Sequence, residues 1–417
     1  MSDNEYGRKL HEFSKTEPEV AIGLIEELHK KRDEHYKLLL KLNDFGKIIY
    51  DSLKGKRNVI KIIKLDEKKY MNKPLAGIDG SMYVTGGRGK RYYTFISAVI
   101  VLIKRGLVSQ KDEIEILYPR DCIKVEAFDD PSLGEEVWKI AEDIMFYYET
   151  KALYEINHLC LSQGDCYYTF IDGPIIDPPR QLSEYGNKFI REKLKSDRLV
   201  SIEEANIDYT TYRVTPIVDA WELRYKKHYI VGYVKSTRTE QLLTKELANM
   251  GVNKDLLSAF TGDDELAYMI LKNAVEYEQN YAYIGPFKVN YDDSKLEYMK
   301  PYLEKGIEIY YIYGINRWHN KVFRLEIGAP KETSYDEISR IFDDIYRLTI
   351  SVTLPGNVHP LPVVIAHEKC KIRPGAAELI YELLLSGVHL EILRSSEIKD
   401  NERLAILNLL RDVIEKH

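Results

Sequence analysis

The feature of the sequence that most constrains its fold is a pair of short apolar strands that each end in Asp-Gly. The segments that end at Asp79 and Asp172 are both rich in strand-forming residues, and a glycine follows each aspartate. A sheet that pairs these strands brings two carboxylates side by side. Two adjacent carboxylates repel one another, and a divalent cation such as magnesium or manganese is the usual remedy. A strand-terminal aspartate can also be only a turn former, so both interpretations stay open.

The elements around these strands predict an α/β fold. The first strand continues through a glycine-rich turn, residues 86–89, into an apolar strand over residues 91–104, which predicts a hairpin. A strand over 114–118, a helix over 133–161 and the strand that ends at Asp172 follow. Three consecutive strands, a helix and a further central strand are typical of the opening of a ribonuclease-H-like mixed sheet flanked by helices, although other α/β folds can begin in the same way.

The rest of the chain divides into helical and mixed parts. Apolar residues recur at helical spacing from about residue 18 to 53, which predicts a helical N-terminal arm over residues 1–70. This arm is expected to pack on its own domain or to contact a second protomer or another partner. We expect the first part of the sheet core over 71–180 and a mainly helical insertion over 181–300 around one strand at 229–235. The remainder of the core, with a hairpin near residues 308–327 and the C-terminal helices, is expected over 301–417.

Composition limits the partners and the compartment. Lys and Arg total 60 against 66 Asp and Glu, a net charge of −6, so any polyanion must meet a local basic groove. The four cysteines contain no Cys-x-x-Cys pair and predict neither a disulfide framework nor a zinc ribbon. The N-terminus lacks the order of a signal peptide, and the longest apolar run is too short to span a bilayer. We therefore expect a cytoplasmic protein with no membrane partner.

Two more side chains could join the aspartates. Glu155 lies on the predicted helix, 17 residues before Asp172, which is enough for the helix to end and the next strand to return. His367 stands among apolar residues of a C-terminal helix, either as a core histidine or as part of a buried metal cluster. It is not part of an H-E-x-x-H motif, and the glycine-rich turn at 86–89 does not fit the spacing of a P-loop.

These motifs, in this order, resemble the NurA family of nucleases. The resemblance rests on Gly-Ile-Asp79-Gly-Ser, on Glu155, on Phe-Ile-Asp172-Gly-Pro and on the late Pro-rich loop that leads into Ala-His367-Glu. It is thin in the first 70 residues and between about 180 and 330. It implies a ribonuclease-H-like fold, a ring-like homodimer and a deoxyribonuclease that acts as an exonuclease and as a single-strand endonuclease. It also implies partnership with HerA, a hexameric DNA-translocating ATPase, in end resection during double-strand-break repair.

The resemblance also implies roles for individual residues. Asp79, Glu155, Asp172 and His367 would be the metal-binding and catalytic residues, with manganese or magnesium, and two such ions would promote in-line attack on a phosphodiester. Where the family typically has a tyrosine eight residues before this histidine, the chain has His359, which is expected to act as an auxiliary ligand or hydrogen-bond donor.

Four cations are expected to contact DNA phosphates. Lys235 is similar to a lysine of the family, and Arg88, Lys90 and Arg91 lie near the first aspartate in sequence. Two alternatives to the DNA nuclease stay open. One is a ribonuclease-H-like nuclease that acts on RNA, and the other is a non-catalytic adaptor that keeps the motor-binding surface.

Overall fold

The computed structural model describes residues 18–54, 59–65, 67–86, 92–118, 124–128, 136–175, 209–235, 241–275, 280–290, 306–316, 318–354 and 357–383, with a few isolated positions. The strands are β1 (Ile60–Lys64), β2 (Leu75–Gly86), β3 (Tyr92–Ile103), β4 (Ile114–Leu117), β5 (Lys124–Phe128), β6 (Tyr168–Asp172), β7 (Tyr229–Val234), β8 (Asn280–Lys288), β9 (Ile307–Ile315) and β10 (Val322–Pro330). The helices are α2 (Pro18–Lys54), α3 (Glu67–Tyr70), α4 (Glu136–Gln163), α6 (Tyr209–Glu222), α7 (Leu242–Asn249), α8 (Lys254–Leu257), α9 (Asp263–Ala274), α11 (Tyr335–Ser351) and α12 (Leu361–Cys370), with short 3-10 turns at Gly106–Val108, Lys111–Glu113 and Arg224–Lys226. No helix in these ranges has the length and apolar character needed to cross a bilayer.

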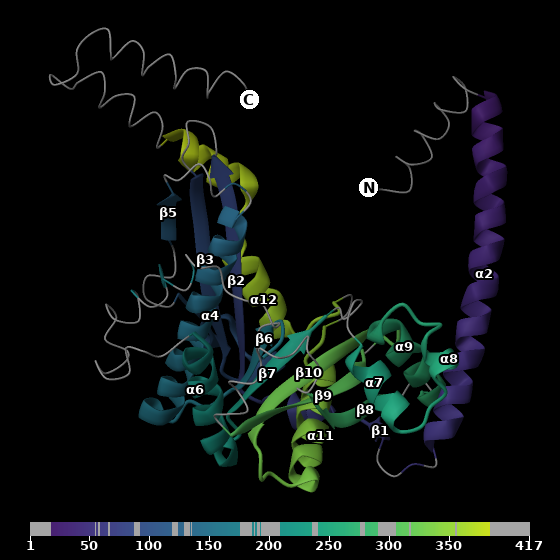
Figure 1. Cartoon of the computed structure of the whole chain (residues 1–417). Coiled ribbons are helices and arrows are strands. Elements are labelled where there is room, and N and C mark those ends of the chain that lie inside the picture. The colour runs from purple at the N-terminus through teal and green to yellow at the C-terminus, as the bar shows by residue number, and fades with distance from the viewer. Residues whose placement is uncertain are drawn as a thin grey trace, which may run out of the picture.

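The ten strands form one mixed sheet in the order β1-β8-β9-β10-β7-β6-β2-β3-β4, with β5 paired to β3 (Figure 1). β6 runs parallel to both β2 and β7, and the other paired strands are antiparallel. The expected α/β architecture, a mixed sheet flanked by helices with a helical N-terminal arm, is confirmed. Both expected hairpins, β2–β3 and β9–β10, are present.

Helices cover both faces of the sheet. On one face, α4 lies over β2 and β3, α6 packs beside α4 over β7 and β10, and α7, α8 and α9 lie at the β8–β9 end (Figure 1). α11 and α12 cover the opposite face. α11 begins where the Ser334 hydroxyl accepts a hydrogen bond from the Glu337 backbone N–H, the usual way to satisfy a free amide at a helix start.

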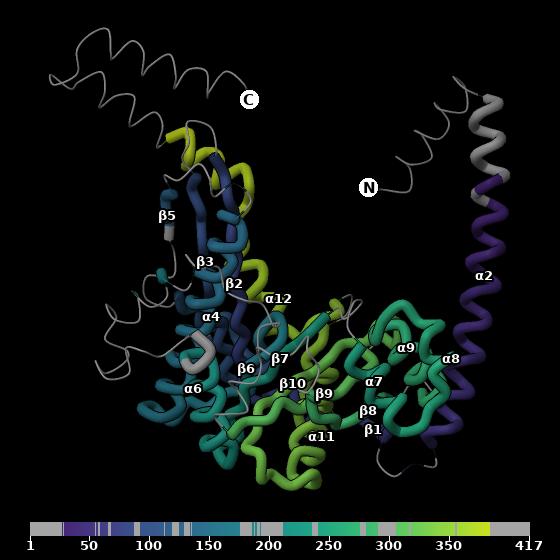
Figure 2. Tube along the Cα trace, viewed as in Figure 1, coloured from purple at the N-terminus to yellow at the C-terminus, as the bar shows by residue number. Residues whose placement is uncertain are grey.

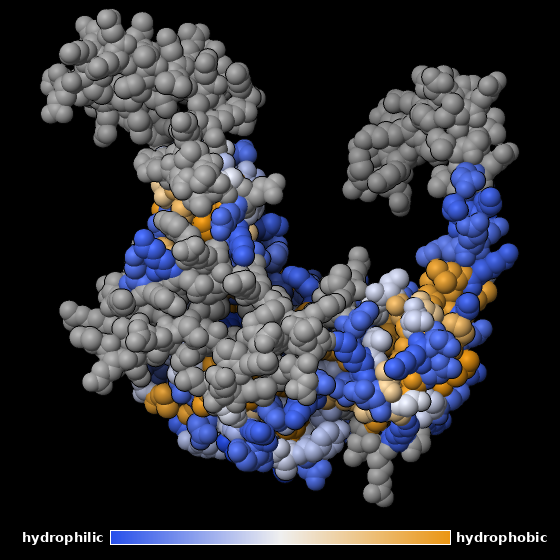
Figure 3. Space-filling model, viewed as in Figure 1, coloured by the Kyte–Doolittle hydropathy of each residue, from blue (hydrophilic) through white to orange (hydrophobic). Residues whose placement is uncertain are grey.

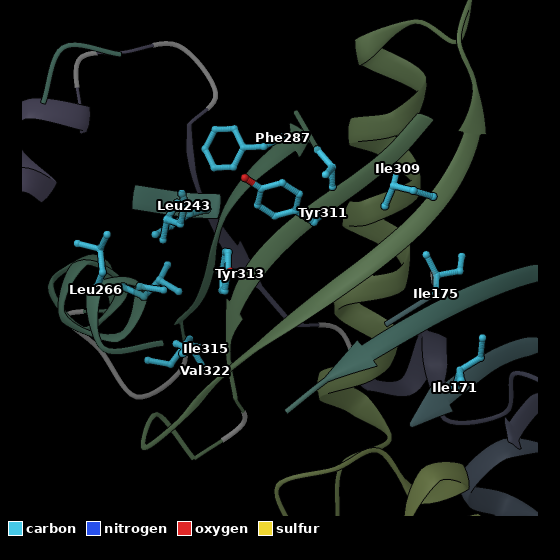
Figure 4. Close-up of a cluster of buried hydrophobic side chains, with 14 of the residues drawn as sticks. Ile171, Ile175, Leu243, Leu266, Phe287, Ile309, Tyr311, Tyr313, Ile315 and Val322 are labelled. Carbon is cyan, nitrogen blue, oxygen red and sulfur yellow. The ribbon is translucent and has the colours of Figure 1, made fainter. Parts of the chain in front are cut away.

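β9 shows how one strand serves both layers. Its odd-numbered residues from Ile307 to Ile315 join the core beneath α7 and α9, whereas Tyr310 and Ile312 join the core beneath α11. This alternation follows from the two-residue period of a strand. Figure 4 shows Tyr311 and Tyr313 of β9 on the same side as Leu243 of α7 and Leu266 of α9.

α2 packs on the body over only part of its length. Its C-terminal part lies against α9, and Leu42, Ile49 and Leu53 are buried there. Figure 2 shows the rest of the helix standing away from the body. On this part Tyr36 is 61% exposed and Leu40 is 49% exposed, and Figure 3 shows apolar side chains gathered on the surface of α2. α2 is therefore one continuous arm with an uncovered apolar surface.

The structure adds features that the sequence patterns did not predict. Strands β1, β5 and β8 are short or interrupted by polar residues. β1 pairs with β8, β5 pairs with β3, and β8 also pairs with β9, and none of these pairs is joined by a tight turn. Cys160 at the end of α4 and Cys166 before β6 form a disulfide, although no disulfide framework was expected. Most of residues 181–208, the first part of the insertion expected to be mainly helical, lies outside the described residues.

Candidate metal centre

The two predicted aspartates meet in the middle of the sheet. β2 and β6 run parallel, and Ile78 lies opposite Ile171. The next residue on each strand is the aspartate, so Asp79 and Asp172 lie side by side, and both side chains are almost fully buried. β2 continues to Gly86 because it stays paired with β3. Asp79 is therefore not at the end of its own strand but at the level where β6 ends.

α12 brings a histidine to these carboxylates. Its first turn packs directly on β2, where a Cβ on Gly77 would lie 2.2 Å from the Pro362 carbonyl oxygen, so this backbone contact requires glycine. From that start, His367 Nδ1 lies 3.0 Å from Asp79 Oδ2 and 3.8 Å from Asp172 Oδ2. The histidine side chain is 50% exposed, so it is not the fully buried residue that its apolar neighbours suggested.

A free cysteine completes the hydrogen bonds to Asp79. Cys370 Sγ donates to Asp79 Oδ2 at 3.3 Å, and the Gly80 backbone N–H donates to Oδ1 at 2.9 Å. Burial and then the Asp79 charge raise the pKa of the thiol, so it stays protonated and acts as the donor. The sequence did not single out Cys370; its only signal is that it lies one helical turn after His367.

A second residue that the sequence did not single out is Glu149 on α4. Its carboxylate reaches β2 from the face opposite α12, at Gly80, where an added Cβ would lie 2.6 Å from Glu149 Oε1. Glu149 is only 4% exposed, and its charge contributes to the raised pKa of Cys370 after burial and Asp79. An acid on the apolar face of α4, in line with Met145 and Ala152, was the available sequence signal.

Glu155, the helix carboxylate expected at the site, lies six residues beyond Glu149. At 1.5 Å per residue this separation is about 9 Å along α4. α4 runs toward the start of β6, whereas Asp172 stands at the end of β6, so Glu155 lies on the side away from the aspartates. Neither glutamate belongs to the cluster of ligand atoms that Asp79, Asp172 and His367 form.

Buried charges hold the turn that follows Asp172. The Ile175 backbone N–H donates to Glu326 Oε2 at 3.0 Å, and the Ile175 carbonyl accepts from Arg213 Nε at 3.2 Å. Arg213 also donates to Thr150 Oγ1 on α4 at 3.2 Å. Because removal of one buried charged partner would leave the other unpaired, these bonds tie the turn to both α6 and β10.

Lys235 and His359 also lie beside the carboxylates. Lys235, directly after β7, pairs with Asp172 through Nζ and Oδ2 at 2.8 Å. The His359 ring lies edge-on to Tyr233 with centroids 5.4 Å apart, and burial lowers its pKa while the Asp172 charge opposes this change. His359 Nδ1 is buried and has no hydrogen-bond partner among the described residues. The other expected DNA contacts, Arg88, Lys90 and Arg91, lie outside the described residues.

The environment of Asp79 raises its pKa to about 6, from an ordinary value of 3.8. Burial is the largest cause and the neighbouring Asp172 charge is the second. The hydrogen bonds from Cys370 and His367 lower the pKa but do not compensate. The ionised carboxylate therefore costs folding free energy unless another positive charge is present.

The metal-free protein should lose stability as the pH rises from about 4 to above 6. The folded state binds the Asp79 proton more tightly than the unfolded state does. The contribution of this proton to the free energy of unfolding is therefore fully present below pH 3.8 and is lost as the pH passes 6, by about 3 kcal/mol in total. We expect Asp79→Asn to be more stable than the native chain at pH 8 by about this amount in chelator, and to lose this advantage at pH 4. Chemical denaturation of both proteins at the two pH values measures it, and equal stability at pH 8 would contradict it.

The donor set fits a divalent cation. The ligand atoms of Asp79, Asp172 and His367 lie within 4.8 Å of one another. Carboxylate oxygens with one imidazole nitrogen suit manganese, and magnesium through the oxygens. A cation here would remove the repulsion that raises the pKa of Asp79, and the unpaired Nδ1 of His359 offers one more polar atom beside it.

Comparison with known proteins identifies the family of the chain. A sequence model described as the NurA domain matches residues 73–372. Among solved structures, the NurA nuclease from Sulfolobus solfataricus has 15% identity over 88% of this chain and 98% of its own, with a TM-score of 0.49. A second crystal structure of NurA has 13% identity over 86% and 97%, with a TM-score of 0.44. No curated protein matches the sequence. Because the NurA model covers well over half of the sequence, from before β2 to just after α12, the chain belongs to the NurA family.

Proposed function

We propose that this chain is a metal-dependent deoxyribonuclease that hydrolyses phosphodiester bonds. The observation that supports this function is the convergence of Asp79, Asp172 and His367, from three separate elements, on one small volume. Manganese or magnesium is the proposed ion, in one or two sites. When bound, the ion would supply Lewis acidity and positive charge at the scissile phosphate.

The residues around the cluster would bind and orient the substrate. Asp79 and Asp172 would be ligands through their carboxylates and His367 through an imidazole nitrogen, while Cys370 holds Asp79 in one orientation. Lys235 lies against Asp172 with its side chain 48% exposed, so its ammonium can move to a phosphate oxygen when an ion neutralises the carboxylate.

His359 would take part in proton handling or substrate binding. Burial favours its neutral form, and its Nδ1 makes no hydrogen bond to any described residue. A neutral imidazole can donate from one nitrogen and accept at the other. In the place of a family tyrosine, His359 would therefore bond to a water or a phosphate oxygen beside Asp172.

The direct test is cleavage of labelled single- and double-stranded DNA, and of RNA of the same sequence, with manganese, magnesium or chelator. Cutting of DNA that requires the ion supports the proposal. Cutting of RNA alone would favour the ribonuclease alternative. No cutting, even with a HerA-type ATPase present, would favour the non-catalytic adaptor.

The wider role is also a proposal. We propose a homodimer that works with a HerA-type hexameric ATPase in DNA end processing during double-strand-break repair, because membership of the NurA family suggests this partnership. The divisions at residues 70, 180 and 300 remain proposed domain limits. The exposed apolar side chains of α2, Tyr36, Leu38, Leu39 and Leu40, are proposed contacts to the second protomer or the motor.

Removal of residues 1–40 should weaken the dimer or the binding of the motor without unfolding the body. The deletion takes away the exposed part of α2 but keeps Leu42, Ile49 and Leu53, which are buried in the core. Light scattering would measure the mass and co-sedimentation the binding of the ATPase, with thermal unfolding as the control for folding. An unchanged mass together with unchanged motor binding would exclude the arm from both contacts.

A further inference from the structure

A cavity opens directly beside the proposed metal centre. It has a volume of about 470 Å³ and lies between the start of α9 and the β9–β10 turn. Lys235 lines it while pairing with Asp172, so the cavity and the carboxylates share a wall. Sites of this size hold small organic molecules, whereas a DNA duplex is far too wide.

The cavity carries a second cation, Lys321, from the β9–β10 turn. Its ammonium has no carboxylate within ion-pair distance in the described part of the chain, and its side chain is exposed. Lys235 and Lys321 line the same cavity, and the charges of both lower the pKa of His359, after burial as the largest cause. The turn is held there because Trp318 Nε1 donates to the Asn357 carbonyl at 3.0 Å. The two lysines are thus suited to one phosphate group.

The other walls of the cavity suit a nucleobase. Tyr268 of α9 packs partly against the core and also lines the cavity, so its ring is a fixed platform. The Asn320 side chain uses its carbonyl oxygen to accept from Asn316, which leaves its NH₂ group without a partner among the described residues. Asp264 and Glu265 line the cavity as well. This mixture of a cation, an amide, an aromatic ring and carboxylates suits one nucleotide rather than a continuous track of phosphates.

We propose that this cavity is a subsite for one unpaired nucleotide next to the scissile bond, with its phosphate between Lys235 and Lys321 and its base on Tyr268. The proposal rests on the proposed nuclease function and adds which residues select the substrate. Most of these residues lie in the part of the chain where the motifs resemble the family least. The subsite therefore predicts a preference for single-stranded over duplex DNA that depends on this chain's own side chains.

The test moves an abasic residue along a labelled single-stranded oligonucleotide. A missing base in the subsite should lower kcat/KM of the native protein about 10-fold, the usual loss when one base no longer stacks. Tyr268→Ala should lower kcat/KM for the intact strand to a similar extent and should show no further loss with the abasic strand. Tyr268→Phe should behave as the native chain. Tyr225→Ala is the matched control, because Tyr225 is 73% exposed and lies before the start of β7, whereas Lys235 follows the end of this strand.

Binding measured in chelator gives a second result that does not depend on cutting. Lys321→Ala should weaken binding of the single strand and reduce the slope of log affinity against log salt concentration by about one. Lys321→Arg should keep the native affinity and the native slope. An abasic effect of equal size in the native protein and in Tyr268→Ala would overturn the subsite while leaving the nuclease in place. A native protein that binds the strand with the expected Tyr268 dependence but never cuts would overturn the nuclease and leave the subsite.

Discussion

Replacing Asp79 with asparagine should abolish metal-dependent cleavage of DNA, with a fall in kcat/KM of about 1,000-fold or more. The carboxylate provides a charged ligand at the centre of the site, and loss of one electrostatic group in an active site commonly costs two to three powers of ten. Asparagine has nearly the same shape, and its one oxygen can keep the bond from the Gly80 N–H, while its NH₂ group takes the place of Oδ2 beside Cys370. The fold should therefore survive the change.

Stability separates a catalytic role for Asp79 from a structural one. Because the ionised side chain destabilises the metal-free fold, Asp79→Asn should be less active but more stable at pH 8. Manganese binding, followed by electron paramagnetic resonance, should weaken in the same variant. The matched control is Asp344→Asn on α11, whose carboxylate accepts from the Tyr168 hydroxyl at the other end of β6, and its activity should stay within about threefold of the native value. Cleavage that survives Asp79→Asn would mean that the active site lies elsewhere.

Glu149→Gln should lower kcat/KM by about 100-fold, whereas Glu155→Gln should change it by less than about threefold. Glu149 is buried, lies against Gly80, the residue after Asp79, and its charge contributes to the raised pKa of Cys370. Glu155 lies about 9 Å further along α4, toward the start of β6. The two substitutions are chemically identical and fall on the same helix, so each controls for the other.

The opposite result would also be informative. If Glu155→Gln abolished cleavage and Glu149→Gln did not, the helix carboxylate implied by the family resemblance would be the functional one. α4 would then have to rotate or shift when metal and DNA bind. Circular dichroism and thermal unfolding of both variants would show whether either change acts through loss of the fold.

Local patterns were sufficient for much of the fold. The apolar segments before Asp79 and Asp172 become parts of β2 and β6, although β2 continues past Asp79 to Gly86. The β9–β10 hairpin and α11 also follow from residues close together in the chain. These elements were predictable because strand alternation, helical spacing and glycine turns depend on neighbours within a few positions. β1, β5 and β8 were missed because each is stabilised by a partner strand distant in sequence.

The site could be predicted only in part. β2 and β6 are parallel, and each aspartate comes directly after the segment of its strand that pairs with the other strand. The proximity of Asp79 and Asp172 therefore follows from the order of strands in the sheet. Cys370 was not predictable, since its donation to Asp79 joins residues 291 positions apart. The choice between Glu149 and Glu155 depends on the position of α4 along β2. Because Gly80 has no side-chain carbon, the Glu149 carboxylate can pack against β2 at that residue.

The sequence by itself therefore determined the α/β class, the strand pair and the two aspartates, because these depend on local period and on the direction of short strands. Only the tertiary structure decided which helix carboxylate and which thiol stand beside them. The physical reason is close packing: the contact of Pro362 with Gly77 places α12, and the tie from Trp318 to Asn357 places the β9–β10 turn beside the carboxylates. Such contacts join distant segments, so no local pattern in the chain encodes them.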